Sequence, residues 1–325
     1  MSPIISVIVP VYNVAPYLEN SITTIMQQSI SDIQIILVND GSSDESGQIC
    51  ERLADKDSRV EYICNEKNSG VSYTRNKGLE QANGQYVYFA DADDKLDSDT
   101  LEFLLSLYKT EADCDLAVCG YYINDEPQKE KNPEIQIMSP SMAAKVFAGM
   151  NGMIVRGYLW NKLFRTELIK NNSLQFDTGC AICEDMLFCE QYIRYCRKII
   201  YEPVPKYHYM VRGGSAMRGR VTAGRMTVFR AYEKIAKVCR EYHDLELNGI
   251  IEGNHMRHYI TIMKYLRKDV TPEEFIYFDE AYKMVKNNFR NIWFHPYIDF
   301  KSKIILLHTL ILYHVKRRRA KGKKK

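Results

Sequence analysis

Short apolar runs alternate with segments of helical periodicity over the first 122 residues. The runs are rich in β-branched and aromatic residues and predict strands over 4–10, 33–38, 60–64, 86–90 and 116–122. Between them, apolar residues recur every three or four positions, which predicts helices over 17–28, from the turn at 39–44 to about 56, 70–82 and 101–109. Because the connections are short, this alternation predicts an α/β fold, a mostly parallel, Rossmann-like sheet between helices.

The pattern is less regular after residue 122. Residues 125–140 are polar and contain three prolines, which predicts a loop or a hairpin. Helices are predicted over 141–149, 160–170 and 184–196, and a late strand over 199–204. From about Thr222 onward, long helical segments rich in Lys, Arg, Tyr and Met predict a helical C-terminal region. We therefore expect an α/β domain over 1–220, a helical region over 221–315 and a basic tail over 316–325.

Charge is distributed unevenly along the chain. The net charge is +3, but eight of the ten residues Lys316–Lys325 are Lys or Arg, so the preceding body is mildly acidic. The tail has three interpretations: a solvated disordered run, a nucleic-acid arm or an anchor on an anionic membrane surface. The tail lacks the interleaved aromatic residues that would support nucleic-acid binding. The apolar stretch Ile304–Val315 directly before the tail favours the membrane anchor.

Cysteine usage and hydropathy indicate the compartment. Nine cysteines without a signal peptide predict free thiols in a reducing environment. The stretch Ile304–Val315 is shorter than the roughly 18 residues that a spanning helix needs. We expect a cytoplasmic protein, peripheral on the inner face of the cell membrane. Cys180 and Cys183 form a C-x-x-C pair, but the seven-residue spacing of the downstream Cys189 and Cys196 favours packed core thiols over zinc or redox chemistry.

Three carboxylates follow the predicted strand 86–90 within four positions. If the chain stays extended there, Asp91 and Asp93 point the same way. Hard divalent cations such as Mg²⁺ and Mn²⁺ bind a few carboxylate oxygens and take water and substrate phosphate at their other positions. The cluster therefore predicts a metal–diphosphate site. The alternative is a loop in which Asp94 or Asp97 caps the next helix.

Other polar loops follow the predicted strands and should gather at one edge of a parallel sheet. Asp40 is placed to hold a ribose hydroxyl or a base N–H, or else to cap the helix after it. Arg75 lies one turn or so after Gly70, where it would neutralise a diphosphate or pair with Asp91 as structural support.

Six motifs in this order resemble family 2 glycosyltransferases of the bacterial capsule and exopolysaccharide type. They are Val9-Pro-Val-Tyr-Asn13, Val38-Asn-Asp-Gly-Ser-Ser-Asp44, Asn68-Ser-Gly with Arg75-Asn76-Lys-Gly78, Asp91-Ala-Asp-Asp94, Trp160-Asn-Lys-Leu-Phe164 and Glu184-Asp185. The resemblance spans about residues 3–215. It implies a GT-A fold, a nucleotide-sugar donor (usually a UDP-sugar), a Mn²⁺ or Mg²⁺ cofactor and inversion at the anomeric carbon.

The resemblance also implies roles for residues of the donor site. It places Pro10, Tyr12 and Asp40 around the nucleobase and ribose, and Asn68, Arg75 and Asn76 near the base and the sugar-phosphate side. Asp91, Ala92 and Asp93 form the D-x-D element, in which Asp91 touches ribose or sugar and Asp93 takes the metal. His208 falls where relatives supply a late metal or diphosphate ligand, although a structural histidine is the alternative. Arg212 and Ser215 fall in a loop that closes over the donor.

Asp185 matches the catalytic base of the family, and Glu184 orients it. Cys183 replaces the usual glycine before this pair. Trp160 and Lys162 bind the acceptor or pack beneath the site, and the sequence leaves both alternatives open. An inverting transfer is one in-line displacement, which needs a carboxylate to take the acceptor proton and a cation to stabilise the leaving diphosphate.

The predicted function is transfer of a hexose or N-acetylhexosamine from a UDP-sugar to a hydroxyl of a growing, lipid-linked surface polysaccharide. A nucleotidyltransferase is one alternative, but the loop after the first strand, Val11-Tyr12-Asn13, lacks the Gly-rich basic cluster expected of it. A non-catalytic nucleotide-sugar-binding protein is the other, and retention of both acidic clusters argues against it.

Overall fold

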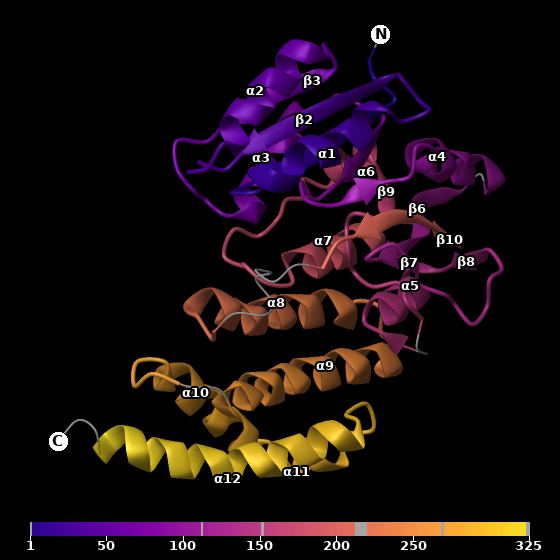
Figure 1. Ribbon diagram of the computed structural model, residues 1–325. Helices are drawn as coiled ribbons and strands as arrows, with labels where there is room; N and C mark the ends of the chain where they lie inside the picture. The colour runs from indigo at the N-terminus through magenta and orange to yellow at the C-terminus, as the bar shows by residue number, and fades with distance from the viewer. Residues whose placement is uncertain (1, 112, 151–152, 212–219, 268–269, 323–325) are drawn as a thin grey trace. The chain divides into compact units, whose positions relative to one another are not determined.

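The computed structural model describes residues 2–111, 113–150, 153–211, 220–267 and 270–322 (Figure 1). The chain divides into two compact units. The first comprises Met1–Gly179 and Glu184–Arg212, and the second comprises Cys180–Cys183 and Gly213–Lys325.

The first unit is built on a ten-stranded sheet in the order β3-β2-β1-β4-β9-β6-β10-β5, with β7 paired to β6 and β8 to β10. The strands are β1 Ile5–Val11, β2 Ile33–Asn39, β3 Val60–Cys64, β4 Tyr86–Phe89, β5 Lys95–Leu96, β6 Cys114–Ile123, β7 Glu126–Pro127, β8 Gln136–Met138, β9 Lys162–Arg165 and β10 Lys198–Tyr209. Strands β3, β2, β1 and β4 run parallel, as do β6 and β10, whereas β9, β5, β7 and β8 are antiparallel to their partners. This mostly parallel, mixed sheet confirms the predicted fold class.

The register of the parallel strands brings their exit loops to one edge. Val11 at the end of β1 pairs with Asn39 at the end of β2, and Ile8 pairs with Phe89 at the end of β4. β1 and β2 are buried along almost their whole length, which explains why both are continuous apolar runs. The loops at 12–13, 40–44 and 90–94 are therefore neighbours in space, as their order in the sequence predicts.

Helices flank this sheet. They are α1 Ala15–Met26, α2 Ser46–Lys56, α3 Val71–Gln81, α4 Thr100–Thr110, α5 Pro140–Phe147, α6 Thr166–Asn171 and α7 Glu184–Ile193. Helix α3 packs on β1 and β2. A Cβ at Gly78 of α3 would lie 2.3 Å from Ile8 Cγ2, so only glycine permits this close approach. The approach carries the start of α3 to the edge where the loops gather.

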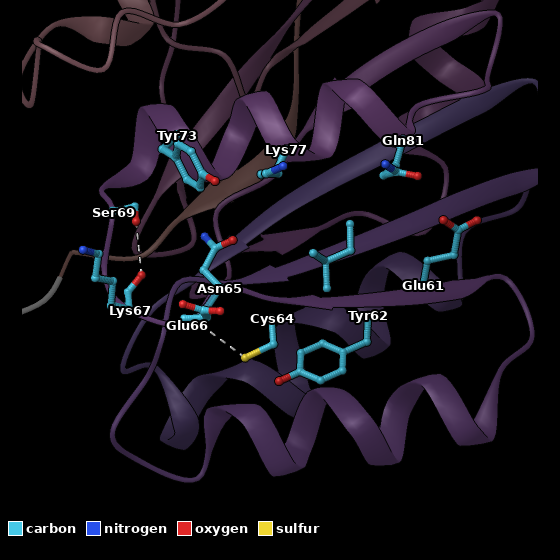
Figure 2. A pocket seen from close by; sticks show the side chains of 11 residues that line it. Glu61, Tyr62, Cys64, Asn65, Glu66, Lys67, Ser69, Tyr73, Lys77 and Gln81 are labelled. Carbon is cyan, nitrogen blue, oxygen red and sulfur yellow. Dashed lines mark hydrogen bonds between the residues drawn. The ribbon is translucent and has the colours of Figure 1, made fainter.

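Strand β3 forms one edge of the sheet, and a groove of about 780 Å³ runs between it and α3 (Figure 2). The side chains of Tyr73, Lys77 and Gln81 line it from α3, and Glu61 and Tyr62 line it from β3. None of the carboxylates in the predicted metal and base clusters lines this groove. The groove reaches Asn65 and Ser69 of the loop before α3, but not those carboxylates.

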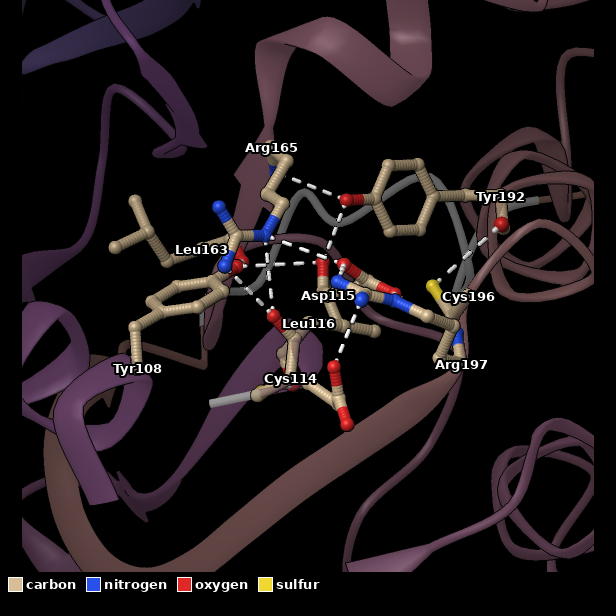
Figure 3. Close-up of polar contacts among 10 residues, drawn as sticks. Tyr108, Cys114, Asp115, Leu116, Leu163, Arg165, Tyr192, Cys196 and Arg197 are labelled. Atoms are coloured by element: carbon tan, nitrogen blue, oxygen red, sulfur yellow. Dashed lines mark hydrogen bonds and ion pairs between the residues drawn. The ribbon is translucent and has the colours of Figure 1, made fainter. Parts of the chain in front are cut away.

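The prediction of a helix over 160–170 is wrong for its first half. Residues Lys162–Arg165 form strand β9, which is antiparallel to both β4 and β6. Figure 3 shows how Arg165 holds it: Arg165 Nε donates to Cys114 O (3.0 Å), and its backbone N–H donates to the Tyr192 hydroxyl (2.8 Å). That hydroxyl donates to Asp115 O (2.7 Å). These partners are distant in sequence, so local periodicity did not reveal the strand.

The late strand is longer than predicted. The sequence predicts 199–204, but β10 continues to Tyr209, with register shifts against β6 around Glu202, Pro205 and Tyr207. Prolines lack the N–H that a regular ladder needs, and the shifts accommodate them without ending the strand. This continuation brings Tyr207 and His208 beside β5.

The second unit is helical, which confirms the predicted C-terminal region. Its helices are α8 Ala223–Arg240, α9 Leu245–Lys264, the 3₁₀ helix η2 Tyr265–Arg267, α10 Phe275–Asn287, α11 Phe289–Phe294 and α12 Phe300–Gly322. Helices α8, α10 and α12 each pack against α9. Among the helices in the described part of the chain, none combines the length and apolar character required to cross a bilayer.

Candidate active site

The loops after β1 and β2 are joined by their own side chains. Asn13 has a left-handed backbone (φ 51°), and its Oδ1 accepts the Ser43 N–H at 2.8 Å. The Asn13 N–H donates to Ser42 Oγ at 3.1 Å. Asp44 Oδ2 accepts the N–H of Ala15, the first residue of α1, at 3.0 Å. The two loops therefore form one preorganised segment of the site's edge.

Asp40 directly follows β2 and is 3% exposed. Its Oδ1 accepts the Ser69 N–H and Asn65 Nδ2, both at 2.9 Å, and its Oδ2 accepts the Gly70 N–H at 2.8 Å. Glu45, and not Asp40, is the N-cap residue of α2, so the alternative of a cap for the following helix is wrong. Asp40 instead holds the loop that leads into α3. Asn68 is exposed on that loop.

The chain turns directly after β4. Asp94 N–H donates to Asp91 O at 3.2 Å, so the segment is not extended, and the expectation that Asp91 and Asp93 point the same way loses its basis. Asp91 and Asp93 are half-buried, whereas Asp94 is fully buried. Asp94 Oδ2 accepts the Tyr207 hydroxyl and Oδ1 accepts the Met210 N–H, each at 2.8 Å. Burial and then the charge of Asp91 raise the pKa of Asp94 to about 8.

Tyr207 fixes this turn to β10, a role that the sequence did not reveal. Its hydroxyl accepts the Asp91 N–H at 3.2 Å and donates to Asp94. The ring is fully buried and stacks on Trp160 at 4.5 Å and 10°. Tyr158 and Tyr209 extend the stack on Trp160. Tyrosines at 207 and 209, two apart in a strand, were the available signal for such a stack.

The burial of Trp160 and Lys162 favours the packing alternative for both. Trp160 is 7% exposed. Lys162 is fully buried, and its Nζ donates to Arg156 O, Tyr158 O and Asn161 Oδ1 at 2.7–2.9 Å. Burial lowers the pKa of Lys162 to about 8.

Arg75 joins the two acidic clusters. Its Nη1 donates to Glu184 Oε1 at 2.8 Å and its Nη2 meets Asp91 Oδ1 at 3.3 Å. Burial by itself would lower the pKa of this guanidinium, but Glu184, Asp91 and Asp185 outweigh it and raise the pKa. Arg75 and Glu184 lie more than a hundred positions apart in the sequence. The fold brings both of them together with Asp91, so that the Arg75 guanidinium contacts both carboxylates. Both alternatives weighed for Arg75 stay compatible with this position.

Asn76 is engaged by the backbone of a neighbouring segment. Its Nδ2 donates to Phe176 O at 2.9 Å and its Oδ1 accepts the Phe176 N–H at 2.8 Å. The Arg75 guanidinium lies 5.5 Å from the centre of the Phe176 ring. Asn76 thus helps to hold the segment beside Arg75.

Glu184 and Asp185 form the first turn of α7, where negative charge favours the helix dipole. Cys183 before them has φ 61°, in the left-handed region that favours glycine. This explains why the related motif has glycine there. Asp185 Oδ1 accepts the Met186 N–H at 2.7 Å. Burial, followed by the charge of Glu184, raises the pKa of Asp185 to about 7, and Arg75 opposes the rise.

His208 is held between two other carboxylates. Its Nδ1 lies 2.7 Å from Asp125 Oδ1 and its Nε2 lies 2.9 Å from Asp97 Oδ1. The imidazole stacks on Tyr122 at 4.2 Å. Asp97 is thus not a helix cap, and α4 has Asp99 at its N-cap. To bind a metal, His208 would have to give up one of these two carboxylates.

The remaining predicted donor residues lie at the same edge or outside the described part. Pro10 is half-buried in β1, and Tyr12 after it is 45% exposed. Ala92 is buried within the turn after β4. Arg212 and Ser215 lie outside the described residues.

The donor set of the turn fits a hard divalent cation. Among the described residues, no group of three or more His, Cys, Asp or Glu side chains is arranged to hold a metal ion by itself. Mg²⁺ and Mn²⁺ do not require such a group, because they are commonly held by one or two carboxylates together with water and substrate phosphates. Asp91 and Asp93 are carboxylates of this kind, placed at the carboxyl edge of the sheet.

Solved structures share this fold over nearly the whole chain. S. aureus TarS 1–349 in complex with UDP has a TM-score of 0.65 and 19% identity, and covers 95% of this chain and 87% of its own. Mannosyltransferase PcManGT from Pyrobaculum calidifontis, in complex with GDP-Man and Mn²⁺, has a TM-score of 0.54 and 15% identity, with coverage of 97% and 87%. The fold is therefore of the GT-A class.

Sequence comparison assigns the family. The model described as Glycosyl transferase family 2 matches residues 6–187, more than half of the chain, and the chain belongs to this family. "Uncharacterized glycosyltransferase EpsJ" of Bacillus subtilis (strain 168) is 35% identical over 195 residues, 58% of this chain and 55% of EpsJ. "Glycosyltransferase GlyA" of Streptococcus pneumoniae serotype 4 is 35% identical over 227 residues, 66% of this chain and 31% of GlyA. The chain thus matches about half or less of the length of these two relatives.

Proposed function

We propose that the protein is an inverting glycosyltransferase that moves a hexose or N-acetylhexosamine from a UDP-sugar to a hydroxyl group. The observation that carries this proposal is the position of Arg75, which contacts Asp91 of one acidic cluster and Glu184 of the other. A base and a leaving-group site for a single displacement must face each other across one sugar carbon. The contacts of one guanidinium with a residue of each cluster support this arrangement.

Asp185 is the proposed base. Proton abstraction is most efficient when the pKa of the base lies near the working pH, and the pKa of Asp185 is raised to about 7. In its ionised form it takes the proton from the acceptor hydroxyl as the oxygen attacks the anomeric carbon. Glu184 is fixed by Arg75 and orients this first turn of α7.

Asp93, with Asp91, would hold Mn²⁺ or Mg²⁺. The cation, when bound, would stabilise negative charge on the departing diphosphate. Arg75 contributes a second positive charge: its Nε is buried without a hydrogen-bond partner among the described residues, and a phosphate oxygen would supply one. His208 remains a candidate for a later ligand only if it leaves Asp97 or Asp125.

The donor site is proposed at the loops after β1, β2 and β4 and at the start of α3. The exposed Tyr12 and the half-buried Pro10 would face the nucleobase of the donor. Asn68 lies on the loop that Asp40 holds. Asp40 and Asn76 act in this proposal by fixing the loops. Arg212 and Ser215 are proposed to close over the donor. The solved complexes of TarS with UDP and UDP-GlcNAc support a UDP-sugar.

The proposed acceptor is a lipid-linked oligosaccharide of a surface polysaccharide. A relative that is 32% identical over 218 residues is named "Minor teichoic acid biosynthesis protein GgaB" of Bacillus subtilis (strain 168), which supports an acceptor of this kind. Such an acceptor would place the enzyme on the cytoplasmic face of the cell membrane, with the basic tail from Lys316 as a contact.

The test is a screen of single UDP-sugars for Mn²⁺-dependent UDP release, with Asp93→Ala as the matched variant. We expect one or a few donors to be turned over and expect the variant to lose metal-dependent UDP binding in calorimetry. Pyrophosphate release from a nucleoside triphosphate and a sugar phosphate would instead indicate a nucleotidyltransferase. Tight UDP binding without any turnover, even with candidate acceptors, would indicate a binding protein.

A further inference from the structure

Five apolar side chains lie exposed in a row along α12. Their exposed fractions range from 38% to 72%, and they are Phe300, Ile304, Leu307, Ile311 and Val315. The spacings of four, three, four and four residues place all five on one side of the helix. We call this side the apolar face of α12. A row of this kind is unusual for a surface that water alone covers.

The opposite side of α12 is packed into the second unit. Leu306, Thr309 and Tyr313 are buried there, and the helix lies against α9, η2 and α10. The Tyr313 hydroxyl donates to Asp279 Oδ1 at 2.7 Å, and Arg317 pairs with the same carboxylate. The packed side fixes the orientation of α12. Because these contacts fix the helix, the apolar face stays exposed in the folded protein.

The charge of α12 has a single sign. Its 23 residues include seven Lys or Arg and no Asp or Glu. Arg318 and Arg319 are exposed one turn beyond the end of the apolar face. Apolar side chains in a row, followed by exposed cations on the same helix, suit a surface that is apolar inside and anionic at its boundary.

We propose that the apolar face of α12 docks the protein onto a bilayer that contains anionic lipids. The alternative is that a second copy of the chain packs against the apolar face of α12 in a dimer. Pairing two α12 helices would bring their cations together with no acidic residue on either helix to offset them. An anionic headgroup layer offsets the same charges. The charge of the helix thus favours the lipid surface.

This inference deepens the membrane contact of the proposed function and rests on it for the place of the enzyme at a membrane, whereas the vesicle binding itself does not depend on glycosyl transfer. It adds named apolar side chains of α12 to the basic residues that follow from Lys316 on the same helix. If the acceptor is lipid-linked, the same surface would hold the enzyme in the plane where that acceptor lies.

The test is co-sedimentation of the full chain with phosphatidylcholine vesicles, with and without phosphatidylglycerol. We expect binding to the anionic vesicles, and expect Ile304→Ser/Ile311→Ser to reduce the partition coefficient by about tenfold or more. Ile137→Ser on β8 removes an isoleucine of similar exposure (51% against 47% for Ile304) and should leave binding unchanged. Arg318→Gln/Arg319→Gln should also weaken binding, by about tenfold, and only to the anionic vesicles.

Equal sedimentation of wild type and Ile304→Ser/Ile311→Ser overturns the proposal, as does a wild type that stays in solution with both vesicles. A wild-type dimer in analytical ultracentrifugation that the double variant dissociates, without vesicle binding, assigns the face to a second copy and also overturns it. UDP binding in the presence of Mn²⁺, measured on every variant, verifies that each is folded. If the wild type does not bind UDP, the result counts against the proposed function but does not affect the conclusion from the vesicles.

Discussion

Arg75 is the side chain through which the two acidic clusters meet. Its guanidinium is 8% exposed, and its contacts to Glu184 and Asp91 are made in a region that is largely shielded from water. A cation in such a place is stabilised only while its partners stay ionised, and they in turn depend on it. The three residues therefore act as one unit, and their loss should be felt in stability as well as in chemistry.

Replacing Arg75 by methionine should destabilise the fold strongly. Arg75→Met leaves two carboxylates without their buried cation, and removal of one partner from a buried pair costs about 3–5 kcal/mol. Arg52 offers a matched control, because it pairs with Glu19 at 3.9 Å with both side chains more than 60% exposed. Arg52→Met should cost less than about 1 kcal/mol. Urea denaturation of both variants checks the contrast, and equal losses would contradict the assignment.

The raised pKa of Asp185 predicts the pH dependence of turnover. As the proposed base, Asp185 must be ionised to accept a proton, and burial shifts its pKa upward to about 7. Below that pH the protonated fraction grows, so kcat/KM should fall about tenfold per pH unit and should level off above it. UDP binding measured over the same pH range shows whether donor affinity also changes, which distinguishes a loss of proton transfer from a loss of donor binding. A profile that is flat from well below to well above neutrality would exclude Asp185 as the base.

Strand β10 positions the carboxylate turn from behind. Tyr207 contacts both Asp91 N–H and Asp94 Oδ2, and Met210 N–H reaches the other Asp94 oxygen. These contacts set where Asp91 and Asp93 present their oxygens. Tyr207 is a positioning residue, because its hydroxyl acts through the turn.

Tyr207→Phe keeps the ring stacked on Trp160 but removes the hydroxyl that the turn uses. We expect the Mn²⁺ concentration for half-maximal activity to rise about tenfold, because the loss of one or two hydrogen bonds corresponds to roughly 1–2 kcal/mol. Tyr192→Phe is the matched control, since its buried hydroxyl also accepts one N–H and donates to one oxygen, that of Asp115. The control should lose similar stability with no change in metal dependence. An equal metal dependence in both variants would assign Tyr207 a general packing role.

The sequence predicted the elements whose pattern is local. Strands β1 to β4 and helices α1 to α4 alternate over short connections, and each carries its own periodicity. The sequence did not predict strand β9, because its partners β4 and β6 lie far away in the sequence. Leu163 and Phe164 are buried only once the sheet has assembled. Motif order identified the acidic clusters, including Asp93 and Asp185. The turn geometry, the Tyr207 contacts and the burial of Lys162 depend on tertiary packing, which a linear pattern does not encode.

The molecule as a whole separates its chemistry from its surface contacts. The first unit carries the sheet, the carboxylate turn and the start of α7, all connected through Arg75. The second unit carries α12 with its exposed apolar face. Because each property resides in a unit with its own core, variants of one should leave the other intact. This separation makes the catalytic proposal testable independently of membrane binding.

Turnover by Asp185→Asn, measured as UDP release with the donor and acceptor that the wild type uses, tests the catalytic proposal. The substitution keeps the shape of the side chain but removes its capacity to take a proton. We predict a loss of kcat of at least about a hundredfold, with UDP-sugar affinity in the presence of Mn²⁺ nearly unchanged. Turnover close to that of the wild type would contradict the claim that the two acidic clusters act together on one sugar carbon.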